Sequence, residues 1–204
     1  GLSYFSQMAV IIFMMFTSAA SGYSACMAMV RGLSGRSMGN FYEDMIRCIT
    51  RILIPAAFVV GLILVSQGVP QTLKGPVTAY TIEGKMQDIA RGPIAALESI
   101  KHLGTNGGGF TGANSANPLE NPNILTNITE LLSMMILPGA CVVTFGHMLH
   151  EQHRLKQAAE LKKKKSKKIL MGSHGRTIFL AMSILFLIGL GICFYAESKG
   201  NPVL

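Results

Sequence analysis

Long uncharged, apolar stretches alternate with polar connectors along this chain. Four stretches of 20 residues or more contain no Asp, Glu, Lys or Arg, and they cover residues 1–30, 52–73, 131–150 and 177–196. A bilayer core is about 30 Å thick, so a helix rising about 1.5 Å per residue needs roughly 20 apolar residues to cross it. A soluble amphipathic helix would instead carry polar or charged residues along one face. The pattern therefore predicts four transmembrane helices.

The composition agrees with a chain that alternates uncharged stretches with connectors of ordinary charge density. Charged residues are 14% of the 204 residues, against roughly 25% in soluble domains. The four uncharged stretches take up 92 residues, and the other 112 carry all 28 charges, which is a normal density of 25%. This distribution excludes a single soluble core and a disordered chain.

The positive charges predict the orientation of the chain in the membrane. Thirteen of the 18 Lys and Arg residues lie in two connectors, 31–51 and 151–176, which two crossings separate. Because positive charge stays inside, we expect both connectors to be cytoplasmic and residues 71–130 to be extracytoplasmic. Six lysines between Lys162 and Lys168 also suit binding to nucleic acid or anionic lipid. No aromatic residues are interleaved with them, so we interpret them as a solvated loop without a nucleic-acid partner.

The cysteines are uninformative, and neither they nor the histidines have a spacing typical of a metal site or a disulfide framework. The four cysteines form no C-x-x-C pair, and His147, His150 and His153 fall three apart at the inner end of the third stretch. No carboxylate or thiol completes that set, so we interpret it as an interfacial helix end. The chain also has no DKTGT phosphorylation sequence and no nucleotide-binding loop, and we expect it to be non-catalytic.

The segment between the second and third stretches has an order of elements that is unusual for a loop. Residues Gly92 to Leu103 predict a short helix with Pro93 in its first turn, too short to cross a bilayer. A glycine strand, Gly104 to Gly109, follows directly, and then a polar run. Between Thr105 and Asn127 the only charged residue is Glu120.

This order predicts a re-entrant pore helix at about 93–103 and a selectivity filter at 104–109. Non-helical backbone at membrane depth must be buried or line a water-filled cavity. Carbonyl oxygens of such a strand replace the hydration shell of potassium, and glycine permits the positive φ angles that align them. The carboxyl end of the short helix carries partial negative charge, which favours a cation nearby.

Two other interpretations of the glycine strand stay open. Glycine runs are often flexible loops. A phosphate-binding loop would follow a strand and precede a helix, whereas this one follows a helix. Lys101 argues against a filter, because a buried cation repels potassium; it must point away or pair, with Glu98 as the candidate partner.

The sequence around the glycine strand resembles a known family. Residues 96–122, ALESIKHLGTNGGGFTGANSANPLENP, are closely similar to the second filter region of KdpA, the potassium-binding subunit family of the bacterial Kdp potassium pump. The flanks resemble it too, including FTSAASGYSACMAMVRGL in the first stretch and LSMMILPGACVVTFGHM in the third. The chain begins with Gly1 and no basic region precedes its first apolar stretch, so we expect an internal fragment of a longer protein.

The resemblance implies an all-α polytopic membrane protein of four pseudo-repeats, each a helix, a pore loop and a helix. This chain would hold the second helix of repeat one (1–30), a cytoplasmic connector (31–51), the whole of repeat two (52–150), a basic cytoplasmic loop (151–176), the first helix of repeat three (177–196) and an outer end (197–204). Potassium would bind at Thr105, Asn106, Gly107, Gly108 and Gly109. Asn106 and Gly108 stand where potassium channels have an apolar and an aromatic residue, so the packed cuff that braces a channel filter is absent.

The resemblance also implies a function and partners. The subunit would take up potassium from outside in an ATP-driven, high-affinity system of the bacterial plasma membrane, and pass it to the ATPase subunit KdpB. Its other partners would be the accessory Kdp subunits, the lipid bilayer and the remaining repeats of its own chain; potassium is the transported ion, and no other cofactor is expected. The alternatives are a passive cation channel of the same architecture, or a membrane anchor in which GTNGGG is only a hinge.

Overall fold

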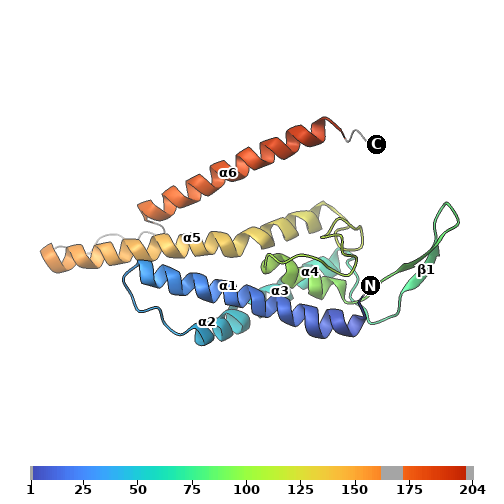
Figure 1. The fold of residues 1–204 in the computed structure, drawn as a ribbon, viewed down its shortest axis with the longest axis horizontal. Helices are drawn as coiled ribbons and strands as arrows, with labels where there is room; N and C mark the ends of the chain where they lie inside the picture. Colours follow the sequence, from blue (N-terminus) through green and yellow to red (C-terminus); the bar gives the residue numbers. More distant parts are fainter. Residues whose placement is uncertain (1, 162–171, 201–204) are drawn as a thin grey trace. The chain divides into compact units, whose positions relative to one another are not determined.

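The chain is built almost wholly of helices (Figure 1). The structure is a computed structural model that describes residues 2–161 and 172–200, without the side chains of residues 154 and 156–161. Its elements are η1 (Ser6–Ile11), α1 (Ile12–Leu33), α2 (Phe41–Cys48), η2 (Ile49–Leu53), α3 (Ile54–Ser66), β1 (Val77–Tyr80), β2 (Met86–Ile89), α4 (Ile94–Leu103), α5 (Ile124–Leu161) and α6 (Ser173–Ser198), where η marks a π-helical turn. The lysine run 162–168 and the end 201–204 lie outside the described residues.

Four helices among the described residues are long and apolar enough to cross a membrane. They are Ser6–Leu33, Phe41–Ser66, Ile124–His153 and Ser173–Ser198. The prediction of four long apolar helices is confirmed in this sense, by length and composition. The re-entrant pore loop remains a prediction.

The second of these helices begins well before its uncharged stretch because Asn40 caps it. The Asn40 Oδ1 accepts hydrogen bonds from the backbone N–H of Tyr42 at 3.0 Å and of Glu43 at 3.3 Å. The helix then widens into the π turn η2 just before Pro55, which lacks an N–H and would clash with a regular preceding turn. The wide turn lets α2 and α3 continue as one helix.

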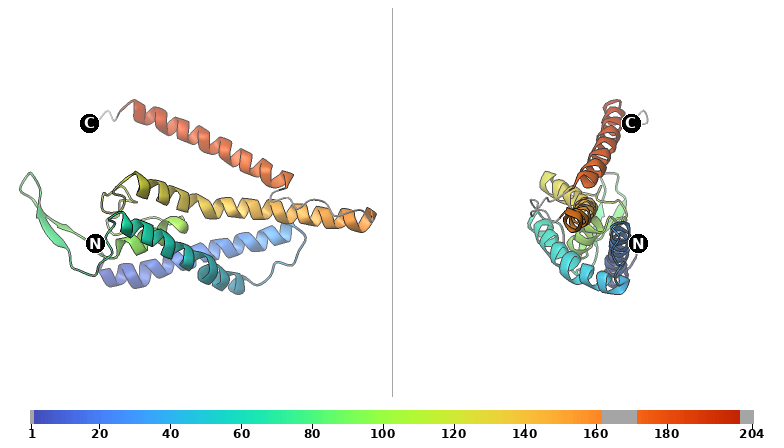
Figure 2. Two further views of the ribbon diagram at one scale, coloured as in Figure 1. Left: turned by 180° about the vertical axis from the view of Figure 1, so that it is seen from behind. Right: turned by 90° about the vertical axis from the view of Figure 1, so that its left-hand side faces the viewer.

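The structure divides into two compact units. The first contains Gly1–Met29 and Met38–Pro138, and the second contains Val30–Ser37 and Gly139–Leu204. In the first unit α4 packs against α3 (Figures 1 and 2). Its main hydrophobic cluster joins α1, the α2–η2 segment and α4, through Met15, Ala20, Cys48, Leu53, Leu97 and Ile100. The short helix therefore lies in the core of its unit.

A β-hairpin in the first unit was not predicted from the sequence. Strands β1 and β2 pair antiparallel, with Val77 opposite Ile89 and Tyr80 opposite Met86, and the hairpin extends away from the helices (Figure 1). Gly84 turns the chain with a φ of 78°. The two strands have four residues each, and most of their side chains are exposed. They therefore lack the alternation of apolar and polar residues by which a strand is predicted from sequence.

Candidate functional site

Helix α4 directly precedes the candidate site and is buried in the protein. Every residue of Ile94–Leu103 except Ala96 is buried. The first two N–H groups of α4 donate to the carbonyl oxygen of Pro70 at 3.0 and 3.1 Å, and the Ala96 N–H donates to Gln71 Oε1 at 3.0 Å. Because the first N–H groups of a helix have no partner within it, these bonds let α4 begin in a buried place.

The glycine strand leaves the carboxyl end of α4 without a spacer. The N–H groups of Gly104, Thr105 and Asn106 each donate to a carbonyl of the last α4 turn, at 2.8, 3.2 and 2.9 Å. Thr105 adopts a φ of 52°, which is uncommon for a residue with a side chain. The chain therefore reverses sharply, and the strand starts beside the end of the buried helix.

Gly108 and Gly109 are required for different reasons. Their φ angles are 92° and 123°, in the left-handed region that favours glycine. A Cβ on Gly109 would lie 2.8 Å from an oxygen of Glu120 and 3.0 Å from an oxygen of Glu98. A Cβ on Gly108 would meet no described atom within 4 Å. Gly108 is thus fixed by backbone conformation alone, and Gly109 also by two carboxylates that approach its Cα.

The Asn106 side chain ties the glycine strand to α1. Its Oδ1 accepts a hydrogen bond from Ser18 Oγ at 3.0 Å, and its Nδ2 donates to the Met15 carbonyl at 3.3 Å. A polar side chain at this position therefore has a structural partner in the first apolar helix. Both ends of the Asn106 amide are therefore anchored to α1.

Lys101 is buried and paired, as the sequence analysis requires. Its side chain is 2% exposed and forms an ion pair with the fully buried Glu98, which confirms the predicted partner. The Lys101 Nζ also donates to Ser115 Oγ at 2.9 Å and to the Gly108 carbonyl at 3.4 Å. The cation therefore lies against the glycine strand with its charge balanced by Glu98.

Ser115 is the centre of a buried polar cluster that we call the rear network: Glu98, Lys101, His102, Ser115 and Glu130. The Ser115 Oγ lies 2.6 Å from Glu98 Oε2 and 2.8 Å from His102 Nε2. A hydroxyl donates once and accepts twice, so it donates to Glu98 and accepts from Lys101 and His102. His102 Nε2 also lies 3.2 Å from Glu130 Oε2 on α5. The network thus links α4, the segment after the strand, and α5.

Burial and partners act in opposite directions on the pKa values of the rear network. Burial raises the pKa of Glu98, but hydrogen bonds from His102, Lys101 and Ser115 together lower that pKa below its usual value. Burial lowers the pKa of His102, but its contacts with Glu130 and Glu98 raise that pKa above its usual value. The network therefore favours an ionised Glu98 and a protonated His102.

These directions predict a pH dependence of stability. The contribution of His102 is complete below its usual pKa of 6.5 and is lost as the pH rises through the raised value. The contribution of Glu98 is present above its usual pKa of 4.5 and is lost as the pH falls through the lowered value. We expect His102→Gln to remove the alkaline loss, measured by thermal unfolding of the complete protein across neutral and alkaline pH. Unfolding midpoints that fall equally in both proteins would contradict this.

Glu120 holds the segment that follows the glycine strand. It is fully buried, and its Oε1 accepts hydrogen bonds from Thr111 N at 3.1 Å and Thr111 Oγ1 at 2.8 Å. Its Oε2 accepts from Ser115 N at 3.0 Å. The one charged residue between Thr105 and Asn127 therefore lies directly behind the strand, next to Gly109.

A strained turn joins Glu120 and the rear network to the strand. Asn114 and Ser115 have φ angles of 50° and 67°, two consecutive left-handed residues that are not glycine. The Asn114 side-chain oxygen accepts a hydrogen bond from the Gly108 N–H. The turn thus presents Asn114 to the strand and Ser115 to the rear network, and such strain persists only when its surroundings hold it.

The five predicted site residues, Thr105 to Gly109, form one continuous segment between α4 and the Asn114–Ser115 turn. Their binding of potassium stays a prediction. Three neighbours of this segment were not predicted from the sequence: Ser115, Glu120 and Glu130. A signal existed for Glu120, as the lone charge of an otherwise neutral run, but the sequence pattern contained none for Ser115.

Glu98, His102 and Glu130 also have the arrangement of a metal site. Their ligand atoms lie within 4.8 Å of one another. The Lys101 ammonium already pairs with Glu98, so we interpret the three as part of an ion-pair network. The Oε1 atoms of Glu98 and Glu130 accept no hydrogen bond from the described residues.

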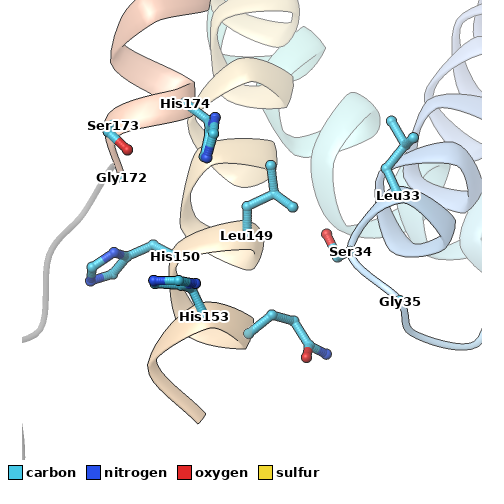
Figure 3. Close-up of a pocket in the computed structure, with 10 residues that line it drawn as sticks. Leu33, Ser34, Gly35, Leu149, His150, His153, Gly172, Ser173 and His174 are labelled. Atoms are coloured by element: carbon cyan, nitrogen blue, oxygen red, sulfur yellow. The ribbon is translucent and has the colours of Figure 1, made fainter. Parts of the chain in front are cut away.

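The predicted histidine group lies in the second unit, where His150 and His153 line a cavity. A cavity of about 390 Å³ is lined by His150 and His153 of α5, by His174 of α6 and by the chain at 33–35 (Figure 3). Within the described part of the chain, these imidazoles belong to no group with metal-ligand spacing. A Cβ on Gly172 would lie 2.7 Å from His150 Cβ, so this glycine allows the close approach of α5 and α6.

The chain is similar over its whole length to a known family. The family described as "KdpA: Potassium-transporting ATPase A subunit" matches residues 1–204. A "Potassium-transporting ATPase potassium-binding subunit 2" of Staphylococcus aureus (strain Mu50) is 51% identical over 205 residues, covering 100% of this chain and 34% of the relative. The corresponding subunit of Staphylococcus haemolyticus is 50% identical over 206 residues, with the same two coverages. The chain spans about a third of the length of these curated relatives.

Proposed function

Because this chain belongs to the KdpA family of potassium-transporting ATPase A subunits, we propose that it is part of the potassium-binding subunit of an ATP-driven potassium uptake system. The proposal is based on the names of its relatives, which describe potassium-binding subunits of a potassium-transporting ATPase. In this function the chain is not catalytic. It binds the ion, and a partner ATPase subunit hydrolyses ATP.

The glycine strand is the proposed ion-binding segment, and its backbone conformation is the observation that carries the proposal. Thr105, Gly108 and Gly109 have positive φ angles directly after the buried end of α4. Such angles let neighbouring carbonyl oxygens turn toward a common ligand, which is how potassium filters replace water. Residues 105–109 would supply one of four such strands, with the other three from the rest of the complete protein.

The proposed topology has residues 31–51 and 151–176 on the cytoplasmic side and 71–130 outside. An ion pair between Arg36 and Glu151, 2.8 Å long, supports the first part, because it joins the two connectors within the second unit. Two segments in direct contact near the membrane must lie on the same side. The extracytoplasmic assignment of 71–130 would let the strand meet potassium from outside.

The proposed partners follow from this arrangement. The four apolar helices expose large side chains, among them Phe58 and Leu62 on α3 and Phe194 on α6. Such faces suit lipid or the neighbouring repeats of the complete chain. The ATPase subunit and the accessory subunits of the complex would bind to the complete protein. Potassium is the transported substrate.

Replacing Gly108 by Asp tests the proposed ion site. We expect the KM for potassium uptake by the complete complex to rise by about tenfold or more, because displaced positioning groups lose up to about 100-fold in efficiency. Gly84→Asp is the matched control, since Gly84 also has a positive φ, of 78°, but lies in the hairpin turn with no described atom near its Cβ position. An unchanged KM for Gly108→Asp would sink the assignment.

Removing the ATPase partner distinguishes a pump from a passive channel. We expect potassium uptake against a concentration gradient to vanish in cells that keep the potassium-binding subunit alone. Uptake down the gradient that persists at the full rate in those cells would instead support the channel. The measurement is potassium content after transfer to low external potassium.

A further inference from the structure

The glycine strand needs a support that its own side chains do not give. Glycine has no side chain to pack and loses more conformational freedom on folding than other residues. Ligand atoms must nevertheless be held within about 0.5 Å of their productive positions. Gly107, Gly108 and Gly109 are three such residues in a row, and the sequence has no aromatic cuff at the corresponding place.

Glu120 has the contacts of such a support. Its two oxygens accept three hydrogen bonds, from Thr111 N, Thr111 Oγ1 and Ser115 N, at 2.8 to 3.1 Å. The carboxylate is fully buried and lies against the Cα of Gly109. Hydrogen bonds to an ionised acceptor are roughly twice as strong as neutral ones. One side chain thus fixes the residues on both sides of the turn that returns behind the strand.

Ser115 connects Glu120 to the glycine strand. Glu120 holds the Ser115 backbone, and the Ser115 hydroxyl accepts from Lys101 Nζ at 2.9 Å. Lys101 Nζ in turn donates to the Gly108 carbonyl at 3.4 Å. The neighbouring Asn114 accepts from the Gly108 N–H. Both polar groups of Gly108 are therefore held by partners whose positions depend on the turn that Glu120 fixes.

We propose that Glu120 is a positioning residue that sets the geometry of the glycine strand, and through it the affinity and ion preference of the site; this rests on the ion-binding function proposed above. The carboxylate is needed as such, because all three groups that face it are donors. An amide would place its own NH₂ against the backbone N–H of either Thr111 or Ser115, and neither N–H can accept a hydrogen bond.

The test compares Glu120→Gln with Glu83→Gln in the complete complex. Glu83 is an exposed carboxylate of the hairpin, 75% exposed, so the same chemical change there controls for charge. We expect Glu120→Gln to raise the KM for potassium by about tenfold, as misplaced groups do, and to change the ratio of the KM values for rubidium and potassium. The maximal rate per assembled complex should change less than the KM. Glu83→Gln should change none of these.

A second variant keeps the test decisive where Glu120→Gln fails to assemble. Thr111→Val removes one donor to Glu120 and keeps the shape of the side chain. We expect it to move the potassium KM and the rubidium-to-potassium ratio in the same direction as Glu120→Gln, and by less. A KM and a ratio that both stay at wild-type values in Thr111→Val, or in assembled Glu120→Gln, would overturn the proposal and leave Glu120 a purely structural residue.

The two proposals fail in different ways. If Gly108→Asp raises the potassium KM while Glu120→Gln and Thr111→Val do not, the strand binds the ion and the positioning role of Glu120 is wrong. If none of the three changes the KM, the ion site lies elsewhere and both proposals are wrong. Gly108→Asp is therefore measured in the same series.

Discussion

Replacing Lys101 by Met should destabilise the protein by up to about 3–5 kcal/mol, because it removes the buried ammonium paired with Glu98 and leaves that carboxylate only the longer 3.3 Å contact with His102 as a cationic partner among the described residues. Lys101 is 2% exposed, and its partner Glu98 is completely buried. The Glu98 carboxylate would keep the hydrogen bond from Ser115, but would lose its only neighbouring ammonium among the described residues. The expected readouts are a lower unfolding temperature of the purified protein and a smaller amount of assembled complex.

Two further variants separate the ion pair from simple loss of a side chain. In Glu98→Gln/Lys101→Met both charges are gone, and most of the lost stability should return, since replacing a buried pair together is often nearly neutral. Lys85→Met is the exposed control: its 3.7 Å pair with Glu83 is 75–80% exposed, and we expect no measurable change. If the double variant is as unstable as Lys101→Met, the pairing of the two charges is not what stabilises this region.

The parts of the fold that sequence alone predicted are those that depend on local pattern. Membrane helices follow from runs of apolar residues, and the Glu98–Lys101 pair follows from their spacing of three positions on one helix. The short helix before the strand also lies where its composition indicated, at Ile94–Leu103. Each of these features is determined within a few turns of the chain.

The remaining site depends on contacts that a local pattern does not contain. Ser115 reaches Glu98 because the Asn114–Ser115 turn adopts two left-handed conformations, which residue preferences disfavour. Glu130 reaches His102 because α5 lies beside the end of α4, 28 positions later in the sequence. Asn106 reaches α1 over a separation of 88 residues. Such long-range partners follow from the packing of whole elements.

These contacts change how the neutral composition of the strand is understood. The sequence predicts an ion site of backbone dipoles with few formal charges, and Thr105 to Gly109 contain none. The structure adds buried charges directly behind that segment, in Glu98, Lys101 and Glu120. In the proposed potassium site, these buried charges would hold the backbone dipoles in place, and Glu98 would balance the charge of the Lys101 ammonium.

Gly109→Ala should have the second large effect, because two separate penalties meet at this residue. A side chain at its φ of 123° is strained by roughly 1–3 kcal/mol. The new Cβ would also lie 2.8 Å from Glu120 and 3.0 Å from Glu98, and overpacking of this kind costs typically about 1–3 kcal/mol more. We expect Gly109→Ala to lower the unfolding temperature of the complete complex and to raise its KM for potassium.

Gly108→Ala and Gly84→Ala separate these two penalties. Both glycines have positive φ angles, 92° and 78°, but no described atom lies near their Cβ positions, so each should show the conformational part alone. Equal losses for Gly109→Ala and Gly108→Ala would show that the carboxylates do not press on the strand. A larger loss at Gly109 would locate the close approach of Glu98 and Glu120 as the reason that only glycine fits there.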